Sequence, residues 1–223
     1  MKLLIIQPKL EHNLVQLEKA LRDHPSVDAV IFPEGYLNEN LEQACGLAQQ
    51  YSRILIGGHR RLQDHPKDRA LIIDRAGAVV LDRRKYSHTI FKRIEGLKVG
   101  HILCDELVLQ GVKGEDTRNI DLIVHPIGVG MFSEEQFEEW IHAARQIAVA
   151  YRAMVIGTSH ADGSFRGADE SIPIAYCFDP HGEVVFISKN DTRTRILDMS
   201  TQTVTFPPLA QHQIENKGFL KEV

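Results

Sequence analysis

Val99–Glu106 reads V-G-H-I-L-C-D-E, a short apolar run that ends at Cys104 and passes directly into acidic residues. Such a run predicts a buried strand. A cysteine at the end of a buried strand has two interpretations. It is either a small hydrophobic residue that completes the strand, because free cysteine is among the most buried residue types, or a nucleophile held where the strand ends. The rest of the chain decides between them.

The sequence before this stretch predicts alternating strands and helices followed by a hairpin. Apolar runs predict strands, apolar residues at helical spacing predict amphipathic helices, and Gly or Pro marks the turns. The expected elements are strand Lys2–Gln7, helix Glu11–Asp23, strand Val27–Phe32, a helix from Asn38 to about Tyr51, strand Arg53–Gly57, and a hairpin formed by Arg69–Asp74 and Ala78–Asp82. Asn38 is expected to cap the second helix.

The second half of the chain repeats this order. The expected elements are strand Val99–Cys104, a short helix Glu106–Lys113, strand Asp121–His125, a helix from Ser133 to about Tyr151, strand Ala153–Gly157, a hairpin formed by Pro173–Phe178 and Glu183–Ser188, and a last strand Thr194–Asp198. Ser133 and Gln136 form a capping-box pattern. Two such halves predict an α/β fold with two sheets packed face to face, each backed by its own helices. We expect one domain over residues 1–223 with an internal pseudo-repeat, and a tail from about 199 to 223 that docks on a dimer partner.

Composition excludes several classes of protein. The chain has 223 residues, of which 43% are hydrophobic and 25% charged, and a net charge of -4. These values are ordinary for a globular protein, and the lack of basic excess argues against a nucleic-acid partner. Three cysteines without C-x-x-C spacing favour a reducing compartment over a disulfide framework. No apolar run is long enough for a membrane span or a signal peptide, so we expect a cytoplasmic protein with no membrane partner.

Glu34, Lys85 and Cys104 each lie at or just beyond the end of a predicted strand. Residues at strand ends beside loops often carry reacting groups. Taken singly, each also has a structural interpretation. Glu34 then is a loop acid that caps the next helix, and Lys85 belongs to a solvated basic turn.

Together, the three residues form a chemical set. A thiol has a pKa of about 8.5, so only a few per cent is thiolate at neutral pH. A nearby lysine favours the thiolate, and a carboxylate can accept the thiol proton as general base. The same lysine and the backbone N–H of Asp105 can stabilise the oxyanion of a tetrahedral intermediate. The set suits acyl transfer through a thioester, with water as the second substrate.

These residues resemble the signature of the nitrilase superfamily of carbon–nitrogen hydrolases. The matching segments are Phe32-Pro33-Glu34, Arg84-Lys85-Tyr86 and Gly100–Glu106, with further similar stretches at His125-Pro126, Trp140 to Arg145 and Ile174 to Val184. The resemblance covers nearly the whole chain in the same order. It implies an α-β-β-α sandwich that usually pairs as a homodimer and needs no cofactor. It also implies Glu34 as base, Lys85 as electrostatic stabiliser and Cys104 as nucleophile.

The chain departs from the family pattern around the cysteine. Only 19 positions separate Lys85 from Cys104, where family members usually have a longer segment that supplies a second glutamate. Glu95 is the only acid in this interval, so the second-glutamate role, and with it contact to the substrate, is assigned to Glu95. The family commonly has Tyr and then Asp after the cysteine, whereas this chain has Asp105 and Glu106. An acid that faces a thiol opposes formation of the thiolate.

Other kinds of site have weaker support. The eleven histidines lack H-x-x-x-H and H-E-x-x-H spacing, so we expect no metal site. His101 alternates with apolar neighbours and is expected to be a hydrogen-bonded strand histidine. The chain has no G-x-S-x-G segment, which argues against a serine hydrolase.

The sequence therefore predicts a thiol-dependent hydrolase of a non-peptide carbon–nitrogen bond in a small molecule. An amide is favoured over a nitrile or a carbamoyl compound, because amidases are the commoner members of the family that the chain resembles. The alternative is a catalytically weak or inactive relative that binds a small ligand or serves as a dimeric scaffold.

Overall fold

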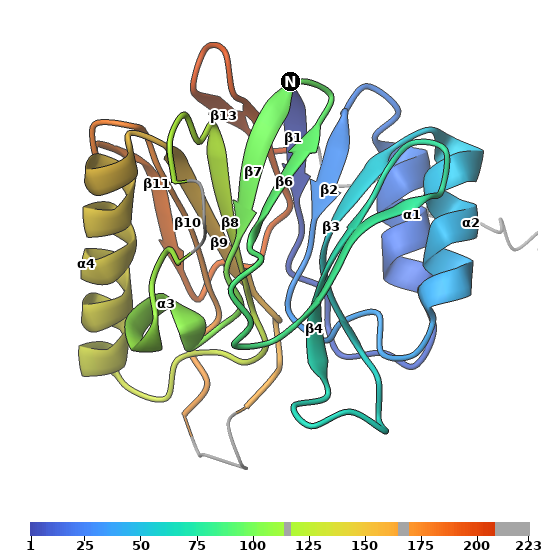
Figure 1. The fold of residues 1–223 in the computed structure, drawn as a ribbon, viewed down its shortest axis with the longest axis horizontal. Helices are drawn as coiled ribbons and strands as arrows, with labels where there is room; N and C mark the ends of the chain where they lie inside the picture. The colour runs from blue at the N-terminus through green and yellow to red at the C-terminus, as the bar shows by residue number, and fades with distance from the viewer. Residues whose placement is uncertain (114–116, 165–169, 208–223) are drawn as a thin grey trace, which may run out of the picture.

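The computed structural model describes residues 1–113, 117–164 and 170–207. Two β-sheets pack face to face, and helices cover their outer faces (Figure 1). This arrangement confirms the α/β four-layer α-β-β-α sandwich expected from the sequence.

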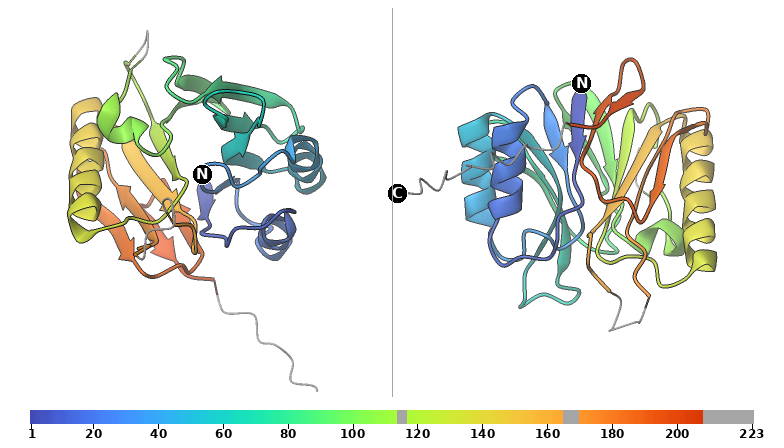
Figure 2. Two further views of the ribbon diagram at one scale, coloured as in Figure 1. Left: turned by 90° about the horizontal axis from the view of Figure 1, so that it is seen from below. Right: turned by 180° about the vertical axis from the view of Figure 1, so that it is seen from behind.

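The first sheet has the strand order β13-β12-β1-β2-β3-β4-β5. Its strands are β1 (Lys2–Ile5), β2 (Ala29–Ile31), β3 (Ile54–Arg60), β4 (Asp68–Ile73), β5 (Val79–Arg84), β12 (Arg195–Asp198) and β13 (Thr203–Thr205). Helices α1 (Val15–Asp23) and α2 (Leu41–Tyr51) cover its outer face (Figure 2). Because β1, β2 and β3 are parallel, their carboxyl ends meet at one edge of the sheet.

The second sheet has the strand order β11-β10-β9-β8-β7-β6. Its strands are β6 (Phe91–Ile94), β7 (Leu97–His101), β8 (Leu122–Ile127), β9 (Met154–Ser159), β10 (Ile174–Phe178) and β11 (Val184–Lys189). The short helix α3 (Glu106–Leu109) follows β7, and the long helix α4 (Glu134–Tyr151) covers the outer face. Strands β7, β8 and β9 are parallel, as are β1, β2 and β3 of the other sheet.

Apolar side chains fill three layers. One lies between the two sheets and includes Ile31 and Ile156, while the other two lie beneath the helices of each sheet. Cys177 is fully buried in the layer between the sheets, where it acts as a small hydrophobic residue. Polar side chains also join the sheets, since Gln7 donates to the carbonyl of Ile174 at 3.0 Å.

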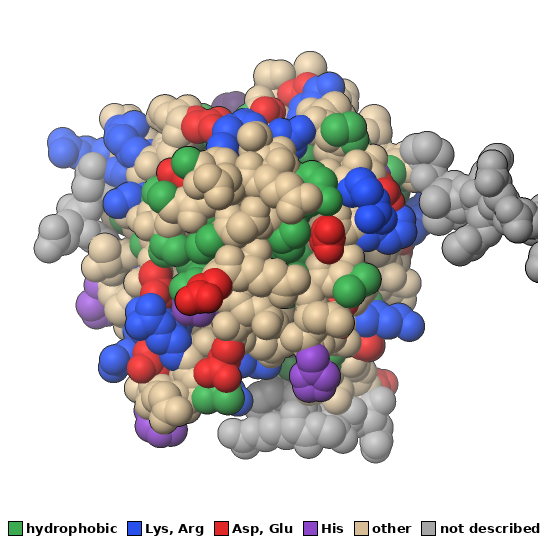
Figure 3. All heavy atoms as spheres, turned by 90° about the vertical axis from the view of Figure 1, so that its right-hand side faces the viewer, with side chains coloured by type: hydrophobic (Ala, Val, Ile, Leu, Met, Phe, Trp, Pro, Cys, Tyr) green, Lys and Arg blue, Asp and Glu red, His purple; other side chains and the backbone are tan. Residues whose placement is uncertain are grey.

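The outer face that carries α1 and α2 is polar. Acidic and basic side chains are scattered over it, and apolar side chains occur among them in small groups (Figure 3). On α1, Lys19 and Asp23 form an ion pair one turn apart. Among the helices of the described residues, none is both long and apolar enough to cross a membrane.

The structure corrects several element ends. Helix α1 begins at Val15 and not at Glu11, and α3 ends at Leu109 and not at Lys113. Strand β7 ends at His101, so Cys104 lies in the turn that follows and not in the strand. Asn38 does not cap α2, because Asn40 occupies the N-cap position and the amide of Asn38 donates to the carbonyl of Glu11 at 2.9 Å.

Two strands were not expected from the sequence. Strand β6 forms an antiparallel hairpin with β7 although its centre is Lys92-Arg93, which masks the apolar pattern of a strand. Strand β13 pairs with β12 within the same chain. Residues 208–223 lie outside the described residues, and docking of the tail on a partner stays a prediction.

Close packing of β3 against the end of β2 gives a test of the fold. Gly57→Ala is expected to lower the free energy of unfolding by about 1–3 kcal/mol, because a Cβ there would lie 2.2 Å from the ring of Phe32. Gly46→Ala is the matched control, since nothing lies within 4 Å of its added Cβ on the exposed side of α2. The free energy of unfolding of Gly46→Ala, measured with urea, is expected to rise by up to about 1 kcal/mol. Equal effects of the two substitutions would contradict this packing.

Candidate active site

Glu34 lies in the turn Pro33-Glu34-Gly35 directly after β2. A side chain at Gly58 would place its Cβ 2.6 Å from the backbone N of Gly35, so a glycine at that position lets β3 approach the turn. Gly35 itself has φ +69°, a conformation that suits glycine. The Glu34 side chain is only 5% exposed and lines a cavity.

Lys85 follows β5 and is held against the first sheet. Its backbone N–H donates to the carbonyl of Asp68 at 3.0 Å. Its Nζ lies 2.9 Å from Oε1 of Glu34 and 2.9 Å from Oδ1 of Asp105. The side chain is 10% exposed, so Lys85 is not part of a solvated turn.

Cys104 lies in the turn between β7 and α3 with φ +45°. Non-glycine residues rarely adopt this left-handed conformation, which costs of order 1–3 kcal/mol and is found disproportionately at functional sites. Both backbone groups of Cys104 are held by β8. Its N–H donates to the carbonyl of Pro126 at 2.9 Å, and its carbonyl accepts from Nε2 of His125 at 2.7 Å.

His125 is buried behind the cysteine turn as a neutral ring. Burial lowers the pKa of His125 to about 4. Nε2 of the His125 ring donates to the carbonyl of Cys104. Nδ1 is therefore unprotonated and accepts a hydrogen bond from the hydroxyl of Tyr176. His125 was noted in the sequence only for its resemblance to the family, and its hydrogen bonds give it a role in holding the turn.

A buried ion pair joins the lysine turn to the cysteine turn. Arg83, at the end of β5, contacts both carboxylate oxygens of Glu106 at 2.8 and 2.6 Å. The same carboxylate accepts from the backbone N–H of Leu103 at 2.6 Å and from that of Tyr86. Sequence reasoning missed both Arg83 and Glu106, whose roles arise only when the two sheets are brought together.

Glu34, Lys85 and Cys104 border a cavity of about 390 Å³. A cavity of this size suits a small molecule. Its lining combines charged and apolar side chains; the lining residues are Glu34, Arg60, Asp68, Lys85, Cys104, Asp105, Gly128, Val129, Met131, Phe132, Gln136 and Trp140. Arg60 and Asp68 form an ion pair of 2.9 Å in this lining.

Electrostatics set the protonation of the three central groups. Burial raises the pKa of Glu34 to about 7, although the Lys85 charge opposes the shift. Burial and the charge of Glu34 raise the pKa of the Cys104 thiol. Burial alone lowers the pKa of Lys85, but the charges of Glu34 and Cys104 outweigh it, and the net pKa of Lys85 is raised. The resting site therefore pairs a neutral thiol with a carboxylate that titrates near neutrality and a charged ammonium.

Gly128 makes room for the base. A Cβ at this position would lie 2.7 Å from Oε2 of Glu34. Its backbone N–H also hydrogen-bonds to the Cys104 side chain and favours the thiolate. The G-V-G segment at residues 128–130 has no nucleotide-binding pattern, and only the structure assigns a function to its first glycine.

Solved structures share this architecture. An amidase from Nesterenkonia sp. AN1 aligns with a TM-score of 0.71 and 13% identity over 89% of this chain and 92% of its own. A carbon-nitrogen hydrolase from Helicobacter pylori G27 gives 0.69 and 16% over 91% and 90%. A CN-hydrolase superfamily protein from Xanthomonas campestris with an arsenic adduct in its active site gives 0.69 and 12% over 91% and 92%. The chain has the nitrilase-superfamily fold. The resemblance inferred from the sequence is thus confirmed at the level of the fold.

No family model matches the chain, and a search of curated proteins also gave no match.

The nitrilase fold brings four of the five residues expected at the site to one cavity, namely Glu34, Lys85, Cys104 and Asp105. Glu95 is not among them. It lies in the turn between β6 and β7, where its carboxylate pairs with Arg75, with Nη2 of Arg75 and Oε2 of Glu95 3.1 Å apart. His101 is a buried strand histidine as expected, and its Nε2 donates to the carbonyl of Gly57 across the two sheets at 2.9 Å.

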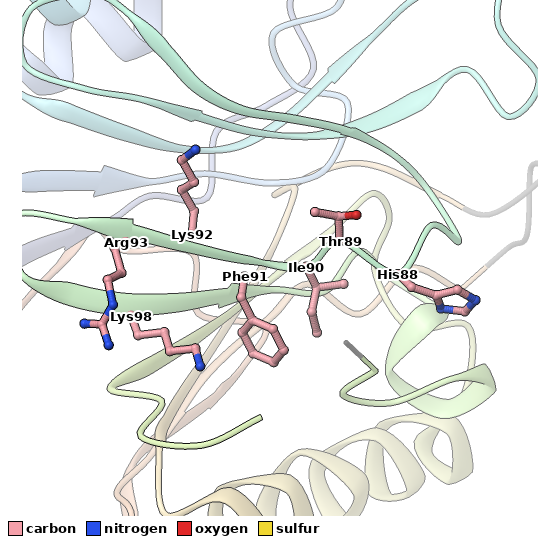
Figure 4. Close-up of a pocket in the computed structure, with 7 residues that line it drawn as sticks. All are labelled: His88, Thr89, Ile90, Phe91, Lys92, Arg93 and Lys98. Atoms are coloured by element: carbon pink, nitrogen blue, oxygen red, sulfur yellow. The ribbon is translucent and has the colours of Figure 1, made fainter. Parts of the chain in front are cut away.

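A second cavity, of about 380 Å³, lies beside β6 and β7 (Figure 4). Its described lining residues are His88, Thr89, Ile90, Phe91, Lys92, Arg93 and Lys98. Among these residues there is no thiol and no carboxylate. The cavity therefore lacks a nucleophile and base of the kind present at Cys104.

The Arg83–Glu106 pair gives a test of how the site is held. Glu106→Gln is expected to lower the free energy of unfolding by about 3–5 kcal/mol, because it leaves the buried Arg83 charge uncompensated. Urea unfolding measures the change. Glu183→Gln is the control, since that side chain is 76% exposed on the turn between β10 and β11, and its effect is expected to stay within about 0.5 kcal/mol. A small loss in Glu106→Gln would contradict a supporting role for the pair.

Proposed function

We propose that the protein hydrolyses the carbon–nitrogen bond of a small amide through a thioester on Cys104. The observation that carries the proposal is the meeting of a thiol, a carboxylate and an ammonium in one cavity. These groups come from three turns that are distant in sequence. Neither sheet alone supplies all three, because Glu34 and Lys85 follow strands of the first sheet and Cys104 follows a strand of the second.

In the first half-reaction, Glu34 accepts the Cys104 proton as the sulfur attacks the amide carbonyl carbon. The oxyanion that forms is stabilised by the backbone N–H of Asp105 and by Lys85. The Nζ of Lys85 pairs at 2.9 Å with one carboxylate oxygen of Glu34 and one of Asp105, and because an ammonium has three N–H groups, a third can donate to the oxyanion. The carbon–nitrogen bond then breaks, Glu34 returns its proton to the nitrogen, and ammonia or an amine leaves.

In the second half-reaction, Glu34 accepts a proton from water, and the resulting hydroxide attacks the thioester carbon. The carbon–sulfur bond breaks as the proton returns to the sulfur, and the carboxylic acid is released. A carboxyl whose pKa lies near 7 suits both directions of proton transfer, since general acid–base groups work best near the operating pH.

Small aliphatic amides are the substrates that the neighbouring structures favour. One structure of the Nesterenkonia amidase is a complex with butyramide, and another shows addition of acrylamide at its active-site cysteine. In this chain, Met131, Phe132 and Trp140 supply apolar lining that suits a short acyl chain. The amide class is a proposal for this chain, because its identity to these proteins is low.

We also propose that the protein works as a homodimer in a reducing compartment such as the cytoplasm. A shallow groove beside α3 and the start of α4 is lined by the exposed apolar side chains Val108, Leu109 and Phe132, which a second copy would cover. A thiol nucleophile requires reducing conditions to stay free. Light scattering on the purified protein measures the assembly, and a monomer at micromolar concentration would contradict it.

Ammonia release across a panel of short primary amides tests the reaction. Wild type is expected to release ammonia from at least one amide, and Cys104→Ala is expected to abolish release, because Cys104 is the only thiol among the described residues that line the cavity. Cys45→Ala is the matched control, since Cys45 lies on α2 away from the cavity. No release by wild type from any amide, nitrile or carbamoyl compound would favour a ligand-binding or scaffold protein instead.

The pH dependence of kcat/KM tests the role of Glu34. The rate is expected to fall about tenfold for each pH unit below an apparent pKa near 7, because the base must be ionised in the free protein. Initial rates across pH 5 to 9 measure the curve. A midpoint near 4.5, the ordinary value for glutamate, would argue against Glu34 as the base in this buried setting.

A further inference from the structure

We infer that Asp105 is the second carboxylate of this site and acts as a positioning residue. Its carboxylate pairs with the Lys85 ammonium, as that of Glu34 does, and so weakens the stabilisation that this ammonium gives to the Cys104 thiolate. The inference deepens the proposed function and rests on it for the catalytic consequence. Its geometry is independent of turnover, and so is the main readout below.

Two carboxylates contact the Lys85 ammonium at equal distance. Its Nζ lies 2.9 Å from Oε1 of Glu34 and 2.9 Å from Oδ1 of Asp105. The second oxygen of Asp105 accepts the hydroxyl of Tyr86 at 2.8 Å, and the Lys85 ammonium lies 5.4 Å from the centre of the Tyr86 ring. The lysine side chain is only 10% exposed, whereas that of Asp105 is 37% exposed, so water screens the contact only from the aspartate side.

Asp105 occupies a role for which the chain has no dedicated segment. The only acid between Lys85 and Cys104 in sequence is Glu95, whose carboxylate is paired with Arg75 outside the cavity. Asp68 also lines the cavity, but its carboxylate is paired with Arg60. Among the acids that line the cavity, Glu34 and Asp105 are therefore the two that contact the ammonium.

The position of Asp105 couples it directly to the nucleophile. It follows Cys104 in sequence, so the same turn that holds the thiol also delivers the carboxylate. The charged or titratable groups that face this cluster are Glu34 after β2, Arg60 on β3, Asp68 on β4, Tyr86 after β5, Cys104 after β7, His125 on β8 and Tyr176 on β10. Arg60 and Asp68 compensate each other, His125 is neutral, and two carboxylates remain against one ammonium.

This balance predicts what the loss of Asp105 does. Removing its negative charge leaves the Lys85 ammonium uncompensated on that side, which stabilises the Cys104 thiolate. It also frees the ammonium to move, since one of its two anchors is gone. The thiol becomes easier to ionise while the oxyanion donor becomes less well placed.

The first test measures ionisation of the thiol. Cys104 of wild type and of Asp105→Asn is alkylated with iodoacetamide across pH 6 to 10, and peptide mass spectrometry follows Cys104 separately from Cys45 and Cys177. Because the pKa of the wild-type thiol is raised, its alkylation rate is expected to rise throughout this range without a plateau. At each pH, Asp105→Asn is expected to be alkylated about tenfold faster, which corresponds to a thiol pKa about one unit lower, and Asp105→Glu, which keeps the charge, is expected to restore the rate towards wild type. An unchanged alkylation rate in Asp105→Asn overturns the inference whether or not the protein hydrolyses amides. Asp105→Ser gives the same reading if the asparagine variant does not fold.

The second test measures placement of the ammonium during turnover. On an amide that wild type hydrolyses, Asp105→Asn is expected to lower kcat by about 100-fold with little change in KM, since a displacement of about 1 Å has that effect. Glu183→Gln, the exposed control, is expected to match wild type in both assays. A rise in KM with unchanged kcat would instead assign Asp105 to ground-state binding and contradict the positioning role.

Discussion

The site depends on one buried ion pair that crosses from one sheet to the other. Arg83 ends β5 of the first sheet, and Glu106 begins α3 after β7 of the second. The Glu106 carboxylate also accepts from the backbone N–H of Leu103, the residue before the nucleophile Cys104. It accepts as well from the backbone N–H of Tyr86, the residue after Lys85. A single buried carboxylate thus sets the distance between the two turns. Removal of one partner from such a pair leaves an isolated buried charge, which strongly destabilises the fold. Both partners are therefore needed to hold the two turns in place.

Charge balance in the cavity follows from this frame. The turn after β7 forces Cys104 into a left-handed conformation and puts Asp105 beside the lysine, while the tight turn after β2 buries Glu34. Burial alone would keep the thiol, the carboxyl and the amine all neutral. Their mutual contacts instead retain a charged lysine and a carboxyl that titrates near neutrality. Gly128 contributes by leaving the carboxylate its space.

The sequence allowed prediction of the layers and of three strand-exit residues, because apolar periodicity and parallel strands place such ends at one edge. It did not allow prediction of β6, whose charged centre hides its pairing, or of Arg83, Glu106 and His125, whose partners come from the other sheet or a distant strand. Glu95 was assigned by its proximity in sequence. It precedes β7 whereas Cys104 follows it, and a strand of five residues separates its ends by about 16 Å.

The strand order at the edge of the first sheet has a consequence for how the chain folds. Strand β1 pairs with β2 on one side and with β12 on the other, and β13 then covers β12. A growing chain therefore leaves one side of β1 unpaired until β12, at Arg195–Asp198, has been made. Pairing of such distant segments is slow, and an open edge invites contact with other chains. The first strand is thus among the last to be completed, long after the groups of the cavity have been synthesised.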